Sequence, residues 1–327
     1  MKTPGINRRT LVLATAGATL ASAAGAQGRA ARAVKIVVGF PPGQATDIVA
    51  RLLADQLKGV TGDTYIVDNK PGQGGSIAMG QVAKSPADGS VMMLTHMSAV
   101  AATPHMYKSV PYDALKDFEA VGLLGDLPFV LVCHPSLPFQ NVADLVRYAK
   151  AHPGRLTHAS SGNGTVSHLA MEALKRRAGI DMLHVPYRGS APGLTDVVAG
   201  QVSVALETAA AVRPFVQSGQ LKALGTGTPQ RMAAFPGVAT IAEQGFEGFS
   251  ASTWLMLIYP ANTDKALVQA TFEAMNKAMR TPEVEARLLQ IGAIPRFSAS
   301  PAEAAAYMRS EYAHWGEVVR QSKVTLD

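Results

Sequence analysis

Short apolar runs and segments with helical spacing alternate along the first hundred positions of the chain. Residues 34–38 form an apolar run typical of a buried strand, and residues 48–57 carry apolar side chains at helical spacing. A second strand is expected at 65–67, a helix at 77–83 and a third strand at 91–95. This strand–loop–helix order predicts a parallel, doubly wound sheet that binds ligands at the carboxyl ends of its strands.

The same alternation returns after a polar, turn-rich segment at 109–118. We expect Ser190 to cap a helix that carries Pro192 in its first turn. The other elements expected in this half are strands at 129–133, 156–159, 184–187, 202–206, 221–224 and 253–259 and helices at 142–149, 166–177, 264–279 and 301–322.

These elements predict an α/β fold of two doubly wound lobes with a ligand cleft between them. Lobe 1 is expected to comprise residues 34–127 and 255–327, and lobe 2 residues 128–254. A chain of about 300 residues is at the size where a single core usually stops growing, which favours two lobes. Two crossovers would form a hinge that closes the cleft around a ligand. The last two helices are expected to pack on lobe 1.

The first 26 residues have the pattern of an export signal. Lys2, Arg8 and Arg9 precede a modestly apolar run at 11–24, and small residues surround a cleavage site after about Ala26. The paired arginines favour the twin-arginine route, and an ordinary Sec signal is the alternative. No later apolar run approaches the ~18 residues that a membrane span needs. We therefore expect an exported, periplasmic protein.

Charge and cysteine content narrow the function further. Loss of the signal lowers the formal charge from +6 to +3, and the basic residues are scattered. The one basic cluster, 175–177, is expected at the solvated end of a helix, so nucleic-acid binding is disfavoured. Cys133 is alone in an apolar run and is expected to be a buried hydrophobe. The eight histidines lack metal-binding spacing, so we expect no metal. We also expect no cofactor and a monomer.

Two loops have the character of anion-binding sites. Residues 40–47 and 160–168 each follow an apolar run and open a helical segment, so each presents unpaired backbone amides and the positive end of a helix dipole. Two such helix ends facing each other would bind an anion. Neither loop contains Lys or Arg. We therefore predict that a small carboxylate is held between them.

Several side chains in these loops have two interpretations. Thr46 either contacts the ligand or caps the helix. Asp47 is expected to brace its loop by accepting backbone hydrogen bonds, because a bare carboxylate would repel an anionic ligand. Arg188 either contacts a distal carboxylate or is structural. Ser76 is the best nucleophile for an alternative function, a secreted hydrolase, but its surroundings lack the second glycine of a nucleophile elbow.

Five ordered motifs carry a family resemblance. They are VVGFPPG at 37–43, DNKPGQGG at 68–75, PYDALKDF at 111–118, the segment 159–168 and HVPYRGSAP at 184–192. Together they resemble the Bug-type solute receptors, the substrate-binding proteins of tripartite tricarboxylate transporters. The resemblance covers essentially the whole mature chain.

The resemblance implies a periplasmic binding protein of type II, the Venus-flytrap class, and no enzymatic activity. Such a receptor captures a small carboxylate by lobe closure and delivers it to a membrane permease. A ligand-loaded co-receptor for a signalling system would use the same fold and site. The binding loops of the family map onto residues 40–47 and 160–165.

Two positions depart from the family pattern and leave the acid open among di- and tricarboxylates, acidic amino acids and aromatic acids. Gln44 replaces a typical second glycine, and the segment with Glu207 replaces one with an Asp and an Asn. The candidate ligand-binding residues are Phe40, Gly43, Gln44, Ala45, Thr46, Asp47, Gly74, Ser76, Ser160, Ser161, Gly162, Gly164, Thr165, His168, Arg188, Ser190 and Glu207.

Overall fold

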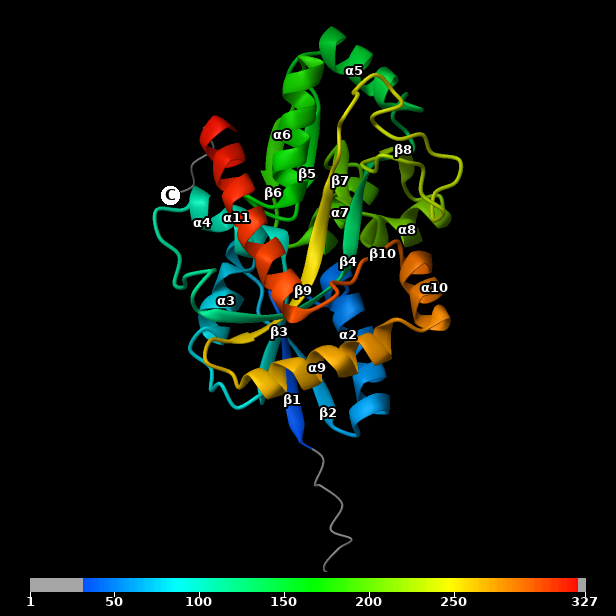
Figure 1. Ribbon diagram of the computed structural model, residues 1–327. Helices are drawn as coiled ribbons and strands as arrows, with labels where there is room; N and C mark the ends of the chain where they lie inside the picture. The colour runs from blue at the N-terminus through cyan, green and yellow to red at the C-terminus, as the bar shows by residue number, and fades with distance from the viewer. Residues whose placement is uncertain (1–31, 323–327) are drawn as a thin grey trace, which may run out of the picture. The chain divides into compact units, whose positions relative to one another are not determined.

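The structure is a computed structural model that describes residues 32–322 (Figure 1). The expected export signal, residues 1–26, lies outside the described residues. Ten strands form one sheet in the order β2-β1-β3-β9-β4-β7-β5-β6, with β10 and β8 also paired to β4. Within residues 32–322, no helix combines the length and the apolar character that crossing a membrane requires.

The first part of the sheet, formed by β2, β1 and β3, is parallel and is covered by helices on both faces. β1 (Ala33–Val38) lies between β2 (Thr64–Asn69) and β3 (Val91–His96). Ile36 on β1 belongs to the same buried cluster as Leu53 of α2 (Ala45–Thr61), whereas its neighbour Val37 belongs to the cluster that contains Met79 of α3 (Ser76–Val82). Successive side chains of a strand point to opposite faces, so one apolar run anchors helices on both sides.

The second part of the sheet repeats this plan. The parallel strands are β5 (Thr157–Ser160), β6 (Leu183–Pro186) and β7 (Val204–Thr208). β8 (Lys222–Thr226) pairs with β4. The helices of this part are α5 (Val142–Ala151), α6 (Val166–Ala178), α7 (Ser190–Val198) and α8 (Ala209–Gln217).

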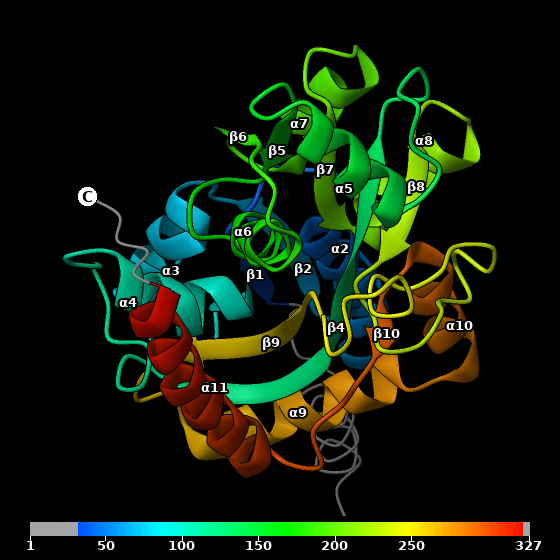
Figure 2. The ribbon, with the colours of Figure 1, turned by 90° about the horizontal axis from the view of Figure 1, so that it is seen from above.

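Two long strands connect the parts. β4 (Phe118–Cys133) pairs with β9 (Ser252–Pro260) up to Pro128 and with β7 and β8 from Phe129 onward. Figure 2 shows β4 and β9 running beside each other as curved strands. The change of partner after Pro128 falls at the boundary expected between the lobes. We propose lobes 34–127 plus 255–327 and 128–254 on this basis.

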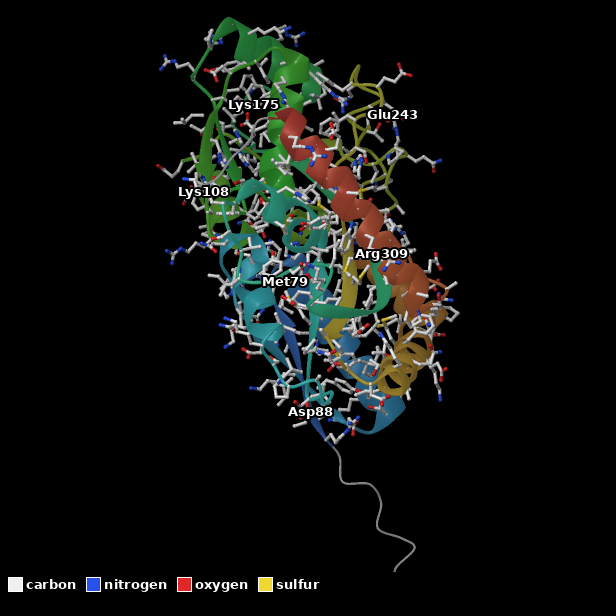
Figure 3. All side chains as sticks on the ribbon, turned by 60° about the vertical axis from the view of Figure 1, so that its left-hand side comes forward. Met79, Asp88, Lys108, Lys175, Glu243 and Arg309 are labelled. Carbon is white, nitrogen blue, oxygen red and sulfur yellow. The ribbon has the colours of Figure 1, made fainter. Side chains whose placement is uncertain are left out.

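The C-terminal elements pack mainly against the first part, as expected. α9 (Lys265–Met279) packs against α2, and α10 (Pro282–Ile291) leads to the short β10 (Ile294–Pro295). α11 (Pro301–Ser322) lies against β4 and the helical segment at 98–106 that follows β3. Figure 3 shows Met79 of α3 in the interior of the molecule, with Asp88 and Arg309 at the surface.

Several sequence expectations are corrected. The strand expected at 129–133 is only the end of β4, because Gly122 and Gly125 interrupt the apolar run and the strand has irregular pairing beside both glycines. The strands expected from 156 and 202 begin at 157 and 204. The helices α8 and α10 and the helical segment at 98–106 were not predicted.

Three predictions about individual side chains have clear outcomes. Ser190 is the first helical residue of α7 and does not cap it, because the cap position is taken by Gly189. Arg176 and Arg177 are exposed at the end of α6, as expected, whereas the side chain of Lys175 is only 12% exposed and its ammonium pairs with Glu172 at 2.7 Å. Cys133 is buried, as expected, and burial raises the pKa of its thiol to about 11.

Candidate ligand-binding site

Loops from both parts of the sheet meet around a cavity of about 250 Å³. They follow β1, β2, β5 and β6, so all four lie at the carboxyl ends of parallel strands. Of the predicted ligand-binding residues, those that line the cavity are Phe40, Gly74, Ser161, Gly162 and Arg188.

The other twelve predicted residues lie outside this lining. They are Gly43, Gln44, Ala45, Thr46, Asp47, Ser76, Ser160, Gly164, Thr165, His168, Ser190 and Glu207. Lining residues that sequence reasoning did not single out include Tyr107, Tyr187 and Gly189. Tyr187 ends an expected strand, so its position could have indicated it. Tyr107 follows a helical segment that the sequence pattern did not predict.

The loops approach one another closely at two glycines, Gly39 and Gly189. A Cβ atom on Gly39 would lie 2.8 Å from Cα of Gly75, so the loops after β1 and β2 touch directly. A Cβ atom on Gly189, where φ is +104°, would lie 2.8 Å from Cδ of Pro41 and 3.1 Å from Oε1 of Gln44. The loop after β6 therefore needs glycine to approach the loop after β1.

The loop after β1 is braced by Asp47, as the sequence predicted. The Gly43 amide donates to Oδ2 of Asp47 at 2.8 Å, and Nδ2 of Asn69 donates to Oδ1 at 3.0 Å and to the Phe40 carbonyl at 2.9 Å. Arg51 also donates to this carboxylate. Burial opposes its ionisation, but the hydrogen bonds from Arg51, Gly43 and Asn69 hold the pKa of Asp47 below its usual value. Asp47 thus ties the start of α2 to β2.

Three side chains at the start of the first part have specific positions. Gln44 occupies the cap position of α2, so neither Thr46 nor Asp47 does. Gln44 is 5% exposed, and its Oε1 has no hydrogen-bond partner in the described part of the chain. Thr46 is buried, and the Phe40 ring stacks on His96 at 4.4 Å. The amide of Gln44 is bulkier than the glycine typical of the family. Since its Oε1 would lie 3.1 Å from a Cβ atom on Gly189, it narrows the space beside that residue.

Hydrogen bonds of side-chain hydroxyls stabilise the conformation of the loop after β5. Oγ of Ser160 lies 2.6 Å from Nε2 of His184 and accepts a hydrogen bond from the Gly162 amide. Oγ1 of Thr165 donates to the Gly162 carbonyl at 2.7 Å, and the Gly164 amide donates to Nδ1 of His168 at 3.2 Å. These contacts keep the loop in shape at the beginning of α6.

Three histidines stack behind this loop, which their sequence separation did not suggest. The rings of His168 and His184 are 4.1 Å apart, and those of His184 and His158 are 4.8 Å apart. Burial lowers the pKa of all three, that of His184 to about 3. Residues 32–322 contain no group of three or more His, Cys, Asp or Glu side chains placed to hold a metal ion. That the protein uses no metal stays a prediction.

Glu207 lies beneath the same loop. It is 2% exposed, and Oγ of Ser161 donates to its Oε1 at 2.6 Å. The Ser161 amide donates to Oγ of Ser167 at 2.9 Å. Burial raises the pKa of Glu207 to about 7, although hydrogen bonds from Ser161 and Ser167 oppose the shift. The site therefore contains one acid that titrates near neutral pH.

Ser76 does not have the surroundings of a nucleophile. It is 1% exposed, begins α3, and donates a hydrogen bond to Oε1 of Gln73 at 3.3 Å. A hydrolytic serine is activated by a neighbouring base, and an amide oxygen is not one.

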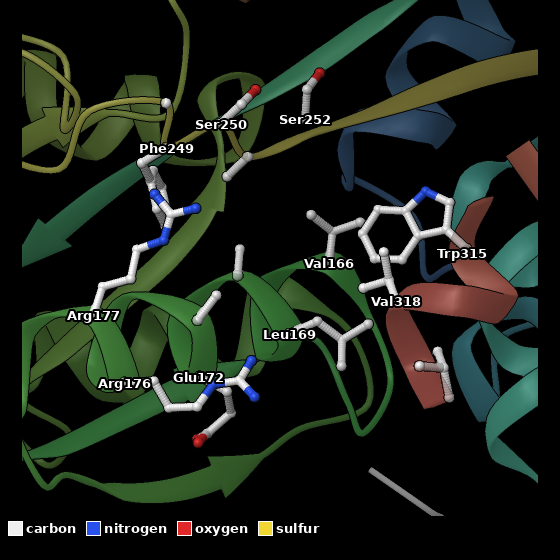
Figure 4. A pocket seen from close by; sticks show the side chains of 15 residues that line it. Val166, Leu169, Glu172, Arg176, Arg177, Phe249, Ser250, Ser252, Trp315 and Val318 are labelled. Carbon is white, nitrogen blue, oxygen red and sulfur yellow. The ribbon is translucent and has the colours of Figure 1, made fainter. Parts of the chain in front are cut away.

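A second cavity, of about 350 Å³, lies between α6 and α11 (Figure 4). Val166, Leu169, Trp315 and Val318 give it apolar walls, and Arg176 lies beside it. None of the predicted ligand-binding residues lines it, within the part of the chain that the structure describes. The smaller cavity combines strand ends, helix starts and buried polar atoms, so it is the better candidate for binding a polar ligand.

The chain is similar to known proteins along most of its length. Residues 49–324 match the family described as the tripartite tricarboxylate transporter family receptor. Protein BugT of Bordetella pertussis (strain Tohama I) is 34% identical over 317 residues, which cover 97% of this chain and 96% of that protein.

Two solved structures are also similar. An R. palustris protein with adipate has a TM-score of 0.87 and 31% identity, covering 91% of this chain and 99% of that chain. MatC from Rhodopseudomonas palustris with bound malate has a TM-score of 0.81 and 29% identity, covering 89% of this chain and 100% of that chain.

Proposed function

The chain belongs to the tripartite tricarboxylate transporter receptor family, and from this premise we propose that it captures a small carboxylate and delivers it to a membrane permease. It is a periplasmic solute-binding receptor with the two-lobe fold of that class. Aliphatic dicarboxylates are the first candidates, because two related structures hold adipate and malate.

The observation that carries the proposal is the meeting of strand-end loops from both parts of the sheet around one cavity. α2 and α6 both begin beside these loops, and the first-turn amides of a helix have no intrahelical acceptors. Their donors and the helix dipoles favour an anion. Arg188 is the cation among the described residues of this lining. Backbone amides therefore supply most of the recognition, at roughly 1.5–3 kcal/mol for each charge-assisted bond.

Binding would act through the distance between the lobes. The contact between Gly189 and Pro41 joins loops from the two proposed lobes. A ligand that bridges these loops favours the closed arrangement over an open one, and so shifts the population. The permease would then recognise the closed form.

A thermal-shift screen of the mature protein tests the proposal. The acids are adipate, malate, citrate, aspartate and benzoate, with the matching neutral amides as controls. A ligand that binds only the folded state raises the melting temperature. A rise with acids but not with amides would support the proposal. If no acid raises it, even after the protein has been unfolded and refolded to remove a carried-over ligand, the carboxylate proposal is wrong.

We expect Arg188→Ala to weaken dicarboxylate binding about tenfold and to change monocarboxylate binding little. Arg188 is an exposed residue of the cavity lining, so its guanidinium would meet the second carboxylate of a longer ligand, and a charged hydrogen bond is worth at least ~1.4 kcal/mol. Isothermal titration with adipate and hexanoate measures this difference. Arg176→Ala, an exposed arginine beside the other cavity, is the matched control. Equal losses for both acids would make Arg188 structural.

A further inference from the structure

Glu207 is buried directly behind a residue that lines the cavity. Its Oε1 is 2.6 Å from Oγ of Ser161, and Ser161 is part of the cavity wall. Its Oε2 is buried and has no hydrogen-bond partner within residues 32–322. The two residues lie 46 positions apart in sequence, at the ends of β7 and β5. A carboxyl group thus controls the hydrogen-bonding state of the hydroxyl of a cavity-lining residue.

The two protonation states of Glu207 orient that hydroxyl differently. When Glu207 is ionised, the Ser161 hydroxyl donates to Oε1, and only its lone pairs remain for the cavity. When Glu207 carries a proton on Oε1, this proton is donated to Oγ of Ser161, and the serine O–H is released from the carboxylate. The O–H can then turn to the ligand or to Oγ of Ser167, which lies 3.3 Å away and is a weaker acceptor for it than a ligand carboxylate. A proton on Oε2 would have no acceptor among the described residues, so Oε1 is the favoured position.

We propose that Glu207 is a positioning residue that sets the direction of the Ser161 hydroxyl, and that a ligand carboxylate binds the form in which Glu207 is protonated. This inference rests on the proposed carboxylate-binding function. A ligand carboxylate needs a donor from Ser161, and it would be repelled by a second negative charge in a site of low dielectric. Ligand binding is then coupled to the uptake of one proton from solvent.

The groups around the Glu207 carboxyl cannot take the place of the proton that it gains when the ligand binds. Hydroxyls of Ser161 and Ser167 face it, as do the amides of Ser161 and Thr208, although neither amide bonds Oε2.

Titratable groups on the packed elements have other partners. Glu172 of α6 contacts His158 of β5 and Lys175, and His168 accepts from Gly164. Nη1 of Arg213 on α8 donates to the Gln290 carbonyl, whereas its buried Nε has no hydrogen-bond partner within residues 32–322. Burial lowers the pKa of His158 and of His168, which favours their neutral form at alkaline pH.

Proton uptake can be measured directly. Adipate and malate are titrated into the protein by isothermal calorimetry at pH 8, in three buffers that differ in ionisation enthalpy. Both acids are fully ionised at this pH, so any proton taken up goes to the protein. We expect uptake approaching one proton per ligand, and an affinity that falls by up to tenfold for each pH unit above 7.

Variants separate Glu207 from other groups. In Glu207→Gln, we expect proton uptake near zero and an affinity that no longer depends on pH between 7 and 9. Glu273→Gln, an exposed glutamate on α9, is the matched control and should keep the wild-type uptake. Ser161→Ala should weaken binding and reduce its pH dependence, because the hydroxyl that Glu207 orients is gone while the repulsion between an ionised Glu207 and the ligand remains.

The outcomes of these measurements distinguish a failure of the Glu207 inference from a failure of the proposed carboxylate-binding function. Ligand binding by the wild-type protein without proton uptake, or equal uptake in Glu207→Gln, overturns this inference while the carboxylate-binding function stands. If the wild-type protein binds none of the acids in the thermal-shift screen, the proposed function fails and this inference fails with it. The wild-type measurement needs no variant, so it is decisive even if Glu207→Gln does not fold.

Discussion

Gly39→Ala is expected to lower the free energy of unfolding by about 1–3 kcal/mol and to weaken carboxylate binding. The added methyl group would lie 2.8 Å from Cα and 3.4 Å from the carbonyl oxygen of Gly75. Both atoms belong to the backbone, so no side chain can rotate to make room. The loops after β1 and β2 must separate, and this displaces Phe40 and Gly74 from the cavity wall.

Urea denaturation and ligand titration measure the two effects of this substitution. Gly59→Ala is the control, because Gly59 is exposed within α2 and a Cβ atom there meets no atom within 4 Å among the described residues. It should raise stability by about 0.5–1 kcal/mol, as alanine does in a helix interior. If Gly39→Ala were as stable and bound as tightly as the control, the direct contact between the two loops would be wrong.

Asp47→Asn is expected to cost about 2 kcal/mol or more of stability at pH 7. An amide cannot accept the bonds from the Gly43 amide, Arg51 and Asn69 together, because one of its two terminal groups is a donor. The loop after β1 would also lose its attachment to β2, so ligand affinity should fall with stability. Asp55→Asn, on the exposed side of the same helix, should change stability by less than about 0.5 kcal/mol.

The effect of Asp47→Asn should depend on pH. The pKa of Asp47 is lower in the folded protein than its ordinary value of 3.8. Its ionised form therefore stabilises the folded state fully above pH 3.8, and this contribution is lost as the pH falls through the folded-state pKa. The stability difference between wild type and variant should shrink over this acid range. A difference that stays constant with pH would show that the carboxylate charge is not what holds the loop.

Local patterns in the sequence predicted much of the fold. Each of the loops at 40–47 and 160–168 adjoins its own strand and helix, so the change from an apolar run to helical spacing located both within a short window. The same pattern did not reveal β4 in full length, because Gly122 and Gly125 break its apolar run. Helix α8 begins with three alanines and contains Pro214, so its spacing carried little signal.

The candidate site was predicted less completely than the fold. Asp47 was correctly expected to brace its loop. It is the third residue of α2, and a carboxylate there can accept a hydrogen bond from an amide just before the helix, here that of Gly43. That Ser160 and Thr165 contact a ligand stays a prediction, whereas the structure shows both hydroxyls in hydrogen bonds that hold the loop. Whether a hydroxyl faces a ligand or its own backbone depends on loop geometry, which composition does not specify.

The amino-acid pattern alone was enough to predict the α/β class, the two helix-opening loops without a cation and the resemblance to carboxylate receptors. Periodicity and turn chemistry act between near neighbours, and they are visible in a single chain. The folded arrangement was needed to show that Glu207 lies behind Ser161, that Gly39 touches Gly75 and that three histidines stack. These contacts join residues far apart in the chain. They depend on strand order and on the packing of helices across the sheet, which no local pattern encodes.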